Sequence, residues 1–189
     1  EKMMCTLADC MKTWAARQPS PPVVERLYTA YHLSSALEYM HAHQICLRDV
    51  HPETFGFDVK GQLKLFDFSR AKKIEDLRKT DRTKSFIEAL NEDYSAPEVM
   101  TGKYGLEADV FSFSILFWQL LMLLPASAAD AEEYRAKIQN RKWPMWVQDI
   151  VRHGLCADVG KRTNIGAVKR CLANVLGVNE RKASHRARQ

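Results

Sequence analysis

The chain has 189 residues, of which 46% are hydrophobic, so it can bury one sizeable core and we expect a single domain. The formal net charge of +5 is modest, and much of it falls in the polar stretch 179–189. We assign residues 1–178 to the domain and 179–189 to a basic, disordered tail, because so polar a stretch buries too little apolar surface to fold. Short basic stretches are more often solvated ends than nuclear-import or nucleic-acid signals, which disfavours a nucleic-acid partner.

The five cysteines are odd in number and form no C-x-x-C pair, a pattern typical of reduced, mostly buried thiols. We therefore expect an intracellular protein, in the cytoplasm or the nucleus. The longest apolar run, 110–124, is interrupted by two serines and a glutamine and is short for a bilayer span. We expect a buried core helix there and no membrane-spanning segment.

Three prolines within 19–22 end the first segment, and a long helix is predicted to follow over 23–43. One face of this helix is apolar at helical spacing, through Leu27, Ala30, Leu33, Leu37 and Met40. His41 and His43 close it. Because residues two apart do not share a helix face, we interpret these histidines as a polar helix end and not as a metal-binding pair.

The stretch 45–67 carries two carboxylates at the ends of strand-like segments, Asp49 and Asp67. Between them, the apolar residues 55–57 and the alternating residues 62–66 flank a glycine-containing turn, which predicts a β-hairpin. Such a scaffold can hold both acids facing one cleft. There, one carboxylate can accept a proton and the other can hold a metal ion.

The second half of the chain is predicted to be helical. A short surface helix is expected over 131–139, and a turn at 142–144 leads into another helix. The apolar face of that helix consists of Trp146, Val147, Ile150 and Val151. The last helix has apolar residues at 3-4-3 spacing, namely Ile165, Val168, Leu172 and Val175.

Short motifs in these segments carry a resemblance to a known family. Residues 47–54 read L-R-D-V-H-P-E-T and residues 67–69 read D-F-S, close to the H-R-D-L-K-P-E-N and D-F-G of eukaryotic-type protein kinases. Residues 96–98 match the family's A-P-E, residues 109–113 its D-V-W-S-F-G, and Arg162 the late arginine that pairs with the A-P-E glutamate. In order and spacing, the motifs resemble the protein kinase family over almost the whole chain.

The resemblance implies a protein-kinase-like fold that is mainly α with a small β-hairpin. Residues 1–5 resemble the hinge, 6–16 the helix after it, and 109–124 the family's central buried helix. The chain is therefore expected to be the C-terminal lobe only. The N-terminal lobe, with its Gly-rich loop, strand lysine and partner glutamate, is absent from this sequence. The sequence leaves open whether the chain is a fragment or natively lacks that lobe.

The resemblance also implies roles for individual residues. Asp49 accepts the proton of a substrate hydroxyl, and His51 stands where the family has a lysine that steadies the transferring phosphate. Asp67 holds magnesium, with Thr54 in place of an asparagine that binds a second metal ion. The implied nucleotide contacts are Glu1, Met3, Thr54 and Gly56. The implied structural and regulatory residues are Arg48, Phe68, Glu98, Asp109 and Arg162.

Further expectations concern what surrounds these residues. Asp109 is expected to cap its helix or to bond backbone amides of the 47–54 loop. Leu47 is expected to pack against Phe68. The segment 68–93 is basic and hydroxyl-rich, and its candidate phosphorylation sites are Thr80, Thr83 and Ser85. A phosphate there would bond to Arg48 and order the segment, the alternative being a mobile surface loop.

Replacements around the nucleotide are expected to weaken the site. An ordinary histidine is only about a quarter charged at pH 7 and reaches less far than the lysine that His51 replaces. The Thr54 hydroxyl is a weaker second ligand. Ser69 replaces a pivot glycine, which costs about 1 kcal/mol if the backbone there needs a φ that only glycine adopts easily. Gly56 replaces a leucine under the adenine ring and forfeits about 1.5–3 kcal/mol of apolar contact.

Four functional hypotheses follow. The first is ATP- and Mg²⁺-dependent phosphoryl transfer to protein Ser/Thr, with weak nucleotide binding and impaired catalysis as the expected state. The alternatives are a functional Ser/Thr kinase in a longer chain with an intact small lobe, and a pseudokinase that only binds protein partners. A small-molecule phosphotransferase fits less well, because A-P-E and the late arginine belong to kinases that act on proteins. Tyrosine specificity is disfavoured.

Overall fold

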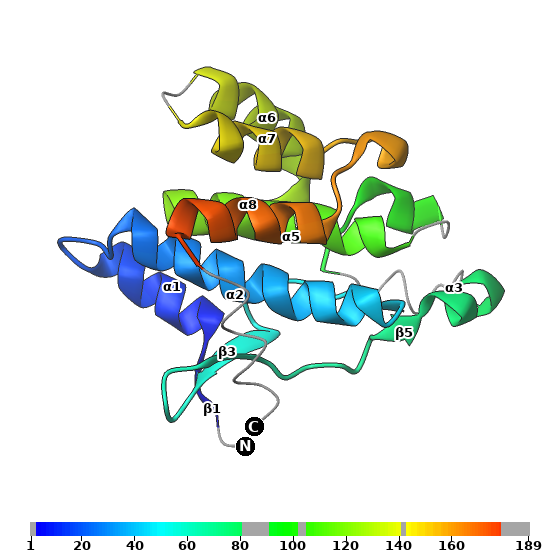
Figure 1. Ribbon diagram of the computed structural model, residues 1–189, viewed down its shortest axis with the longest axis horizontal. Helices are drawn as coiled ribbons and strands as arrows, with labels where there is room; N and C mark the ends of the chain where they lie inside the picture. The colour runs from blue at the N-terminus through cyan, green and yellow to red at the C-terminus, as the bar shows by residue number, and fades with distance from the viewer. Residues whose placement is uncertain (1–2, 81–90, 102–104, 141–142, 179–189) are drawn as a thin grey trace.

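The computed structural model describes residues 3–80, 91–101, 105–140 and 143–178, and they form layers of helices with a small sheet at one side (Figure 1). The layer of α6 and α7 lies farthest from the sheet, α5 and α8 come next, and α1 and α2 lie closest to it. The helices are α1 Leu7–Ala16, α2 Val23–Ala42, α3 Ile74–Thr80, α5 Leu106–Met122, α6 Ala131–Asn140, α7 Met145–Gly154 and α8 Ile165–Leu176. Short 3₁₀ turns are η1 Pro97–Thr101, η2 Ala128–Asp130 and η3 Val159–Lys161.

Helix α5 is the centre of the core, as the apolar run 110–124 predicts. Its middle is buried on all sides, with Phe113, Ile115, Leu116 and Phe117 fully inaccessible to solvent. The helix begins three residues before Asp109 at Leu106, and its N-cap is Gly105, which has no side-chain cap. The expectation that Asp109 caps this helix is therefore wrong. A helix that is apolar all round can lie only in the interior, which fixes α5 at the middle of the layers.

Helix α2 confirms the predicted long helix, and its apolar face is buried as expected. It packs against α5 partly through Arg26, whose Nη1 donates to the carbonyls of Leu120 and Leu121 at 3.1 and 2.7 Å. These carbonyls lie in the last turn of α5, where helix carbonyls lack partners within the helix. Burial lowers the pKa of Arg26. The Arg26 guanidinium thus provides hydrogen-bond donors for the carbonyls at the C-terminal end of α5, and it loses part of its own hydration in doing so.

One histidine at the end of α2 corrects the sequence interpretation. His43 is exposed, but His41 is only 8% exposed, because its ring bonds to Asp109 of α5. The prediction of a polar helix end is therefore right for His43 and wrong for His41. Spacing within one helix cannot reveal a partner that lies 68 residues away.

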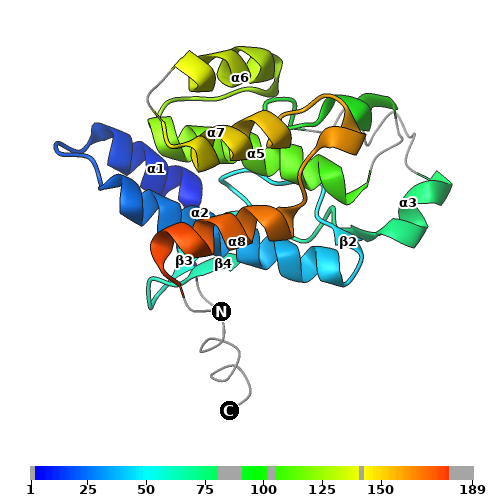
Figure 2. The ribbon, with the colours of Figure 1, turned by 45° about the horizontal axis from the view of Figure 1, so that its top comes forward.

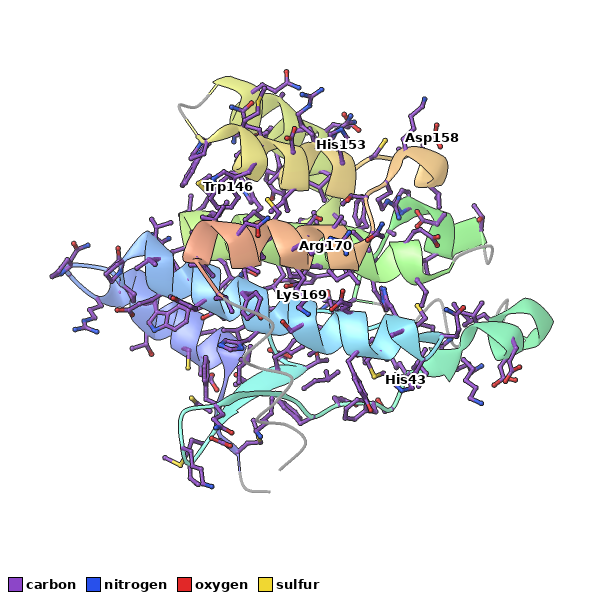
Figure 3. All side chains as sticks on the ribbon, in the orientation of Figure 1. His43, Trp146, His153, Asp158, Lys169 and Arg170 are labelled. Atoms are coloured by element: carbon purple, nitrogen blue, oxygen red, sulfur yellow. The ribbon has the colours of Figure 1, made fainter. Side chains whose placement is uncertain are left out.

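Helix α8 lies along α2, as both ribbon views show (Figure 2). Lys169, labelled on α8 in Figure 3, joins the two helices through its Nζ, which lies 2.7 Å from Oε2 of Glu38. Ile165, Val168 and Leu172 are buried as predicted, but Val175 is 44% exposed. The prediction that Val175 belongs to the buried face is wrong, because the last turns pack on the core through Leu172, Ala173 and Leu176 instead.

Helix α6 is more than a surface helix, because Tyr134 and Ile138 are buried and Tyr134 stacks on Trp118 of α5 at 4.8 Å. The cysteines also depart from expectation. All five are free, but only Cys46 is buried and the others are half-buried. Burial raises the pKa of the Cys46 thiol well above its ordinary value. Within the described ranges, no helix has both the length and the apolarity that crossing a bilayer requires.

The predicted hairpin is confirmed as β3 Phe55–Asp58 and β4 Leu63–Leu65, and β1 Met3–Thr6 adds a third antiparallel strand in the order β1-β3-β4. Its turn is closed by Asp58, whose Oδ1 accepts from the amides of Lys60 and Gln62 at 2.8 and 2.9 Å. Gly61 provides the positive φ of +72° that this turn requires. A separate two-stranded ribbon pairs β2 Ile45–Cys46 with β5 Lys72–Lys73.

The contact between α5 and α7 leads to a stability prediction. A Cβ added at Gly154 would lie 1.9 Å from Oγ of Ser114, which is held by its bond to the Val110 carbonyl. We expect Gly154→Ala to lower the free energy of unfolding by about 1–3 kcal/mol through overpacking. Urea denaturation measures this. Gly160→Ala, whose Cβ meets only Asp158 Oδ1 at 3.4 Å, is the matched control and should change stability by less than about 0.5 kcal/mol. Equal midpoints for the two variants would contradict the close contact.

Candidate active site

The loop that carries Asp49 is held at its start by the buried carboxylate of Asp109. Asp109 Oδ2 accepts from the amide of Leu47 at 2.7 Å, and Oδ1 accepts from the amide of Arg48 at 2.8 Å. His41 Nε2 lies 2.9 Å from Oδ2. Arg48 has φ +65°, a strained conformation that a non-glycine residue keeps only when its surroundings fix it. Of the two expected roles for Asp109, bonding to the loop amides is therefore the one observed.

The same loop is braced internally by Thr54. The Thr54 hydroxyl donates to the His51 carbonyl at 2.9 Å, lies 3.4 Å from the His51 amide, and belongs to a residue that is 1% exposed. The Pro52 carbonyl accepts from the amide of Ala8, which ties the loop to α1. The expectation that Thr54 contacts nucleotide and a second metal ion needs correction, because its hydroxyl is enclosed and used by the loop itself.

Asp49 lies at the wall of an open cavity of about 520 Å³. Its side chain is 12% exposed, and its Oδ1 has two neighbours, His51 Nε2 at 3.3 Å and Arg70 Nη1 at 3.4 Å. The cavity is lined by Asp49, His51, Glu53, Arg70, Asn91, Glu92 and Asp93. The carboxylate is thus within reach of a molecule that enters the cavity, and it lies between an imidazole and a guanidinium.

Asp67 follows β4 and forms a tight local turn. Its Oδ1 accepts from the amide of Ser69 at 2.9 Å, and this hydrogen bond is the main reason that the pKa of Asp67 is lowered. The charges of His51 and Arg70 lower it further, although they contribute less. Asp67 is not part of the lining of the Asp49 cavity. The expectation that both acids face one cleft therefore stays a prediction.

The position under the expected adenine ring is filled from within the protein. Gly56 is buried on β3, and a Cβ there would lie 2.6 Å from the carbonyl oxygen of Cys5 and 2.9 Å from Cε of Met3. Glycine is therefore required by the close approach of β1, and the Met3 side chain occupies the space that a larger residue would need. Glu1, the other expected nucleotide contact, lies outside the described residues.

The turn after Asp67 contains two residues for which the sequence made predictions. Phe68 is 49% exposed while Leu47 is fully buried, so Phe68 lies largely at the surface, and the expected contact between the two stays a prediction. The turn in which the Ala71 amide donates to the Phe68 carbonyl leaves the ring at the surface. Ser69 is not among the residues with positive φ, so the expected cost of replacing glycine does not arise in this conformation.

The segment after this turn begins with regular structure, β5 and α3, and not with the alternative of a mobile loop. Of the candidate phosphorylation sites, Thr80 is the last residue of α3, and Thr83 and Ser85 lie outside the described residues. Arg48, the expected phosphate receiver, uses its Nε to donate to the Arg70 carbonyl at 2.5 Å. Its guanidinium therefore already holds the turn that carries Arg70.

The segment 91–98 is fixed by the ion pair between Glu98 and Arg162 that the sequence analysis implies. Arg162 Nη1 and Nη2 reach the two Glu98 oxygens at 2.5 and 3.1 Å, and Nη1 also donates to the Glu107 carbonyl at 2.9 Å. The guanidinium lies over the Phe111 ring at 5.1 Å. A planar fork that makes two parallel hydrogen bonds fixes geometry as well as charge. The cavity wall at 91–93 is thereby attached to the core.

Sequence reasoning missed two residues of this site, Arg70 and Tyr94. Tyr94 is buried, its hydroxyl donates to Gln119 at 2.6 Å, and its ring lies 6.0 Å from that of His51. Burial raises the pKa of Tyr94. Arg70 comes directly after the D-F-S triplet, and this adjacency was the one signal available in the sequence. Neither hydrophobic periodicity nor a known motif predicted that the Arg70 side chain contacts Asp49.

Comparison with known proteins gives consistent matches. The family described as "Protein kinase domain" matches residues 6–172. Calcium-dependent protein kinase 3 of Plasmodium yoelii yoelii is 30% identical over 144 residues, which cover 69% of this chain and 26% of that protein. The carbon catabolite-derepressing protein kinase of Secale cereale is 31% identical over 151 residues, which cover 75% of this chain and 29% of that protein. The chain thus spans only a quarter to a third of the length of these relatives.

The bonds of Asp109 lead to a prediction. Asp109→Asn should lower the free energy of unfolding by about 3 kcal/mol, because one accepting oxygen becomes an NH₂ group that faces an N–H donor in a buried site. Thermal and urea denaturation measure the loss. Asp149→Asn, an exposed residue of α7, is the control and should change stability by less than about 0.5 kcal/mol. Wild-type stability of the Asp109 variant would show that the loop does not depend on this carboxylate.

Proposed function

Since this chain belongs to the protein kinase family, we propose that it is the C-terminal lobe of such a kinase, with its hinge at residues 1–5, and that it supports ATP-dependent phosphoryl transfer to protein Ser/Thr at an impaired rate. The observation that carries the proposal is Asp49. This carboxylate lies at the end of a loop anchored by Asp109 and lines a cavity of about 520 Å³. A general base needs this combination of fixed position and access.

Asp49 is proposed to accept the proton of the substrate hydroxyl. A hydroxyl that enters the cavity can reach this carboxylate, because Asp49 lines the cavity together with His51 and Arg70. Because Oδ1 of Asp49 lies beside His51 and Arg70, the carboxylate is held in position at the wall of the cavity. The wall at 91–93, attached to the core by Glu98 and Arg162, is where a protein substrate would lie.

Among the described residues, one of the two expected magnesium ligands, Asp67, is suited to that role and the other, Thr54, is not. Asp67 is ionised at neutral pH, because hydrogen bonds from the backbone and side chain of Ser69 lower its pKa. Magnesium commonly uses one or two carboxylates together with substrate phosphates and water, so Asp67 can hold the ion with ATP. Bound there, magnesium would neutralise charge that develops on the phosphates. The enclosed hydroxyl of Thr54 does not fit the second ligand.

The impairment is proposed from the nucleotide side of the site. The Met3 side chain and the Cys5 carbonyl lie where a side chain at position 56 would support adenine, and Thr54 is used by its own loop. These features also favour the second candidate function, a lobe that binds protein partners without transferring phosphate. In either case, we propose an intracellular protein whose partner or substrate is another protein, consistent with five free cysteines.

Nucleotide binding gives the first test. We expect 10 mM Mg-ATP to raise the melting temperature of the chain by about 3 °C, the shift for a Kd near 1 mM. Asp67→Asn should abolish the shift, because it removes the charged metal ligand. Asp158→Asn is the matched control, since Asp158 also accepts a hydrogen bond from the amide two residues on, that of Gly160 at 3.0 Å, but it is the N-cap of η3. An undiminished shift in the Asp67 variant would exclude it as the metal ligand.

Phosphoryl transfer gives the second test. With a Ser/Thr protein substrate and labelled ATP, Asp49→Asn should lower kcat by about 10²–10⁴-fold, the range of general-base catalysis. The thermal shift with Mg-ATP should persist, because Asp49 is not proposed to hold the metal ion. If the wild type binds Mg-ATP but transfers no phosphate to any protein substrate, the binding-module alternative replaces the enzyme.

A further inference from the structure

We propose that Arg70 is a catalytic residue of this chain, which supplies the permanent positive charge for the transferring phosphate that His51 cannot supply. This inference rests on the phosphoryl transfer proposed above and deepens it. The resemblance puts a lysine for this task at position 51, where the chain has histidine. The cavity is also lined by Arg70, a cation that no sequence motif predicts, and it lies where the charge of the missing lysine is needed.

The position of Arg70 is the first support. Its Nη1 lies 3.4 Å from Asp49 Oδ1, and His51 Nε2 lies 3.3 Å from the same oxygen. All three residues line the cavity of about 520 Å³. Arg70 therefore lies about as close to the proposed base as His51, the residue that replaces the lysine.

The anchoring of Arg70 is the second support. Its backbone carbonyl accepts from Arg48 Nε at 2.5 Å, and the Arg48 amide in turn donates to the buried Asp109. Asp49 holds the far end of the side chain, which is 29% exposed. A cation fixed at both ends needs little reorganisation when charge develops beside it, which is the condition for electrostatic stabilisation of a transition state.

The chemistry of guanidinium is the third support. It is charged at every physiological pH, whereas a histidine is charged only in part near neutrality. It has five N–H donors in a planar fork suited to phosphate oxygens. Only one nitrogen of Arg70 contacts Asp49, and its other N–H groups donate to no residue that the structure describes. These donors are available for the oxygens of the transferring phosphate.

The proposed step balances without change to Arg70. The oxygen of the substrate hydroxyl forms a bond to the γ-phosphorus of ATP, the bond from that phosphorus to the β-bridging oxygen breaks, and ADP leaves with the electron pair. The hydroxyl proton goes to Asp49. Arg70 donates hydrogen bonds to the oxygens of the phosphoryl group throughout, most strongly in the transition state.

The test uses the full chain with four variants: Arg70→Gln, Arg70→Lys, the double variant His51→Lys with Arg70→Gln, and Arg152→Gln as a half-buried arginine on α7 distant from the cavity. The first readout is the ratio of the Kd values for Mg-ADP and Mg-ATP by calorimetry, which needs no turnover. The preference for ATP reports the contact with the γ-phosphate. The second readout is kcat and KM for a Ser/Thr peptide.

We expect Arg70→Gln to lower the preference for Mg-ATP by about tenfold with the Kd for Mg-ADP within twofold, and to lower kcat by about tenfold to a hundredfold with KM unchanged. Arg70→Lys and the double variant should recover both quantities to within about threefold of wild type. Arg152→Gln should match wild type. A merely structural role for Arg70 would not be rescued by a lysine at position 51.

Two results would overturn the inference. The first is an Arg70→Gln variant whose ADP-to-ATP ratio and kcat stay within twofold of wild type. The second is an increase in kcat, which would mean that Arg70 restrains Asp49 and does not assist it. If the wild type prefers Mg-ATP but transfers no phosphate, the proposed transfer fails, and loss of that preference in Arg70→Gln still assigns the phosphate contact. If no nucleotide binds, both proposals fail together.

Discussion

The site depends on one charge in the core, the carboxylate of Asp109. This residue is 1% exposed, and a carboxylate so deeply buried is tolerated only if hydrogen bonds replace its hydration. Two of its donors are the amides of Leu47 and Arg48, so satisfying the charge also fixes the first two residues of the loop that presents Asp49. Arg48 is thereby kept at φ +65°, and its side chain holds the carbonyl of Arg70. The central helix thus sets the geometry of a cavity that it does not itself line.

The two sides of the site obey different local requirements. On the Asp49 side, charged groups converge on an open cavity whose wall is attached to the core by the Glu98–Arg162 pair. On the side expected to receive the nucleotide, the protein itself uses the polar groups and fills the space. The Thr54 hydroxyl satisfies the backbone of its own loop, and Gly56 lets the Cys5 carbonyl approach β3 closely. The contacts on the Asp49 side therefore leave charged groups accessible to a ligand. The contacts on the nucleotide side leave the Thr54 hydroxyl and the space beside Gly56 already occupied.

Much of the fold could be predicted from the sequence, because it follows from local periodicity. The 3.6-residue spacing of Leu27, Ala30, Leu33 and Leu37 fixed α2, and the apolar run around Phe113 fixed α5 at the centre. Predictions failed where a residue's environment depends on a distant segment. His41 is buried because it bonds to Asp109, which lies 68 residues further along the chain, and Val175 is exposed although its spacing matches the buried face of α8.

By itself, the sequence determined the order of the helices and the hairpin and the position of the central helix. It also identified the acids Asp49 and Asp67, because the motifs that contain them can be read from the sequence alone. Only the tertiary structure decided which groups meet those acids. It brought Arg70 to Asp49, enclosed Thr54 within its loop, and put the Met3 side chain beside Gly56. The physical reason is that the secondary structure of a residue follows largely from its neighbours along the chain. The charges and the space around its side chain depend on distant segments that only folding brings near.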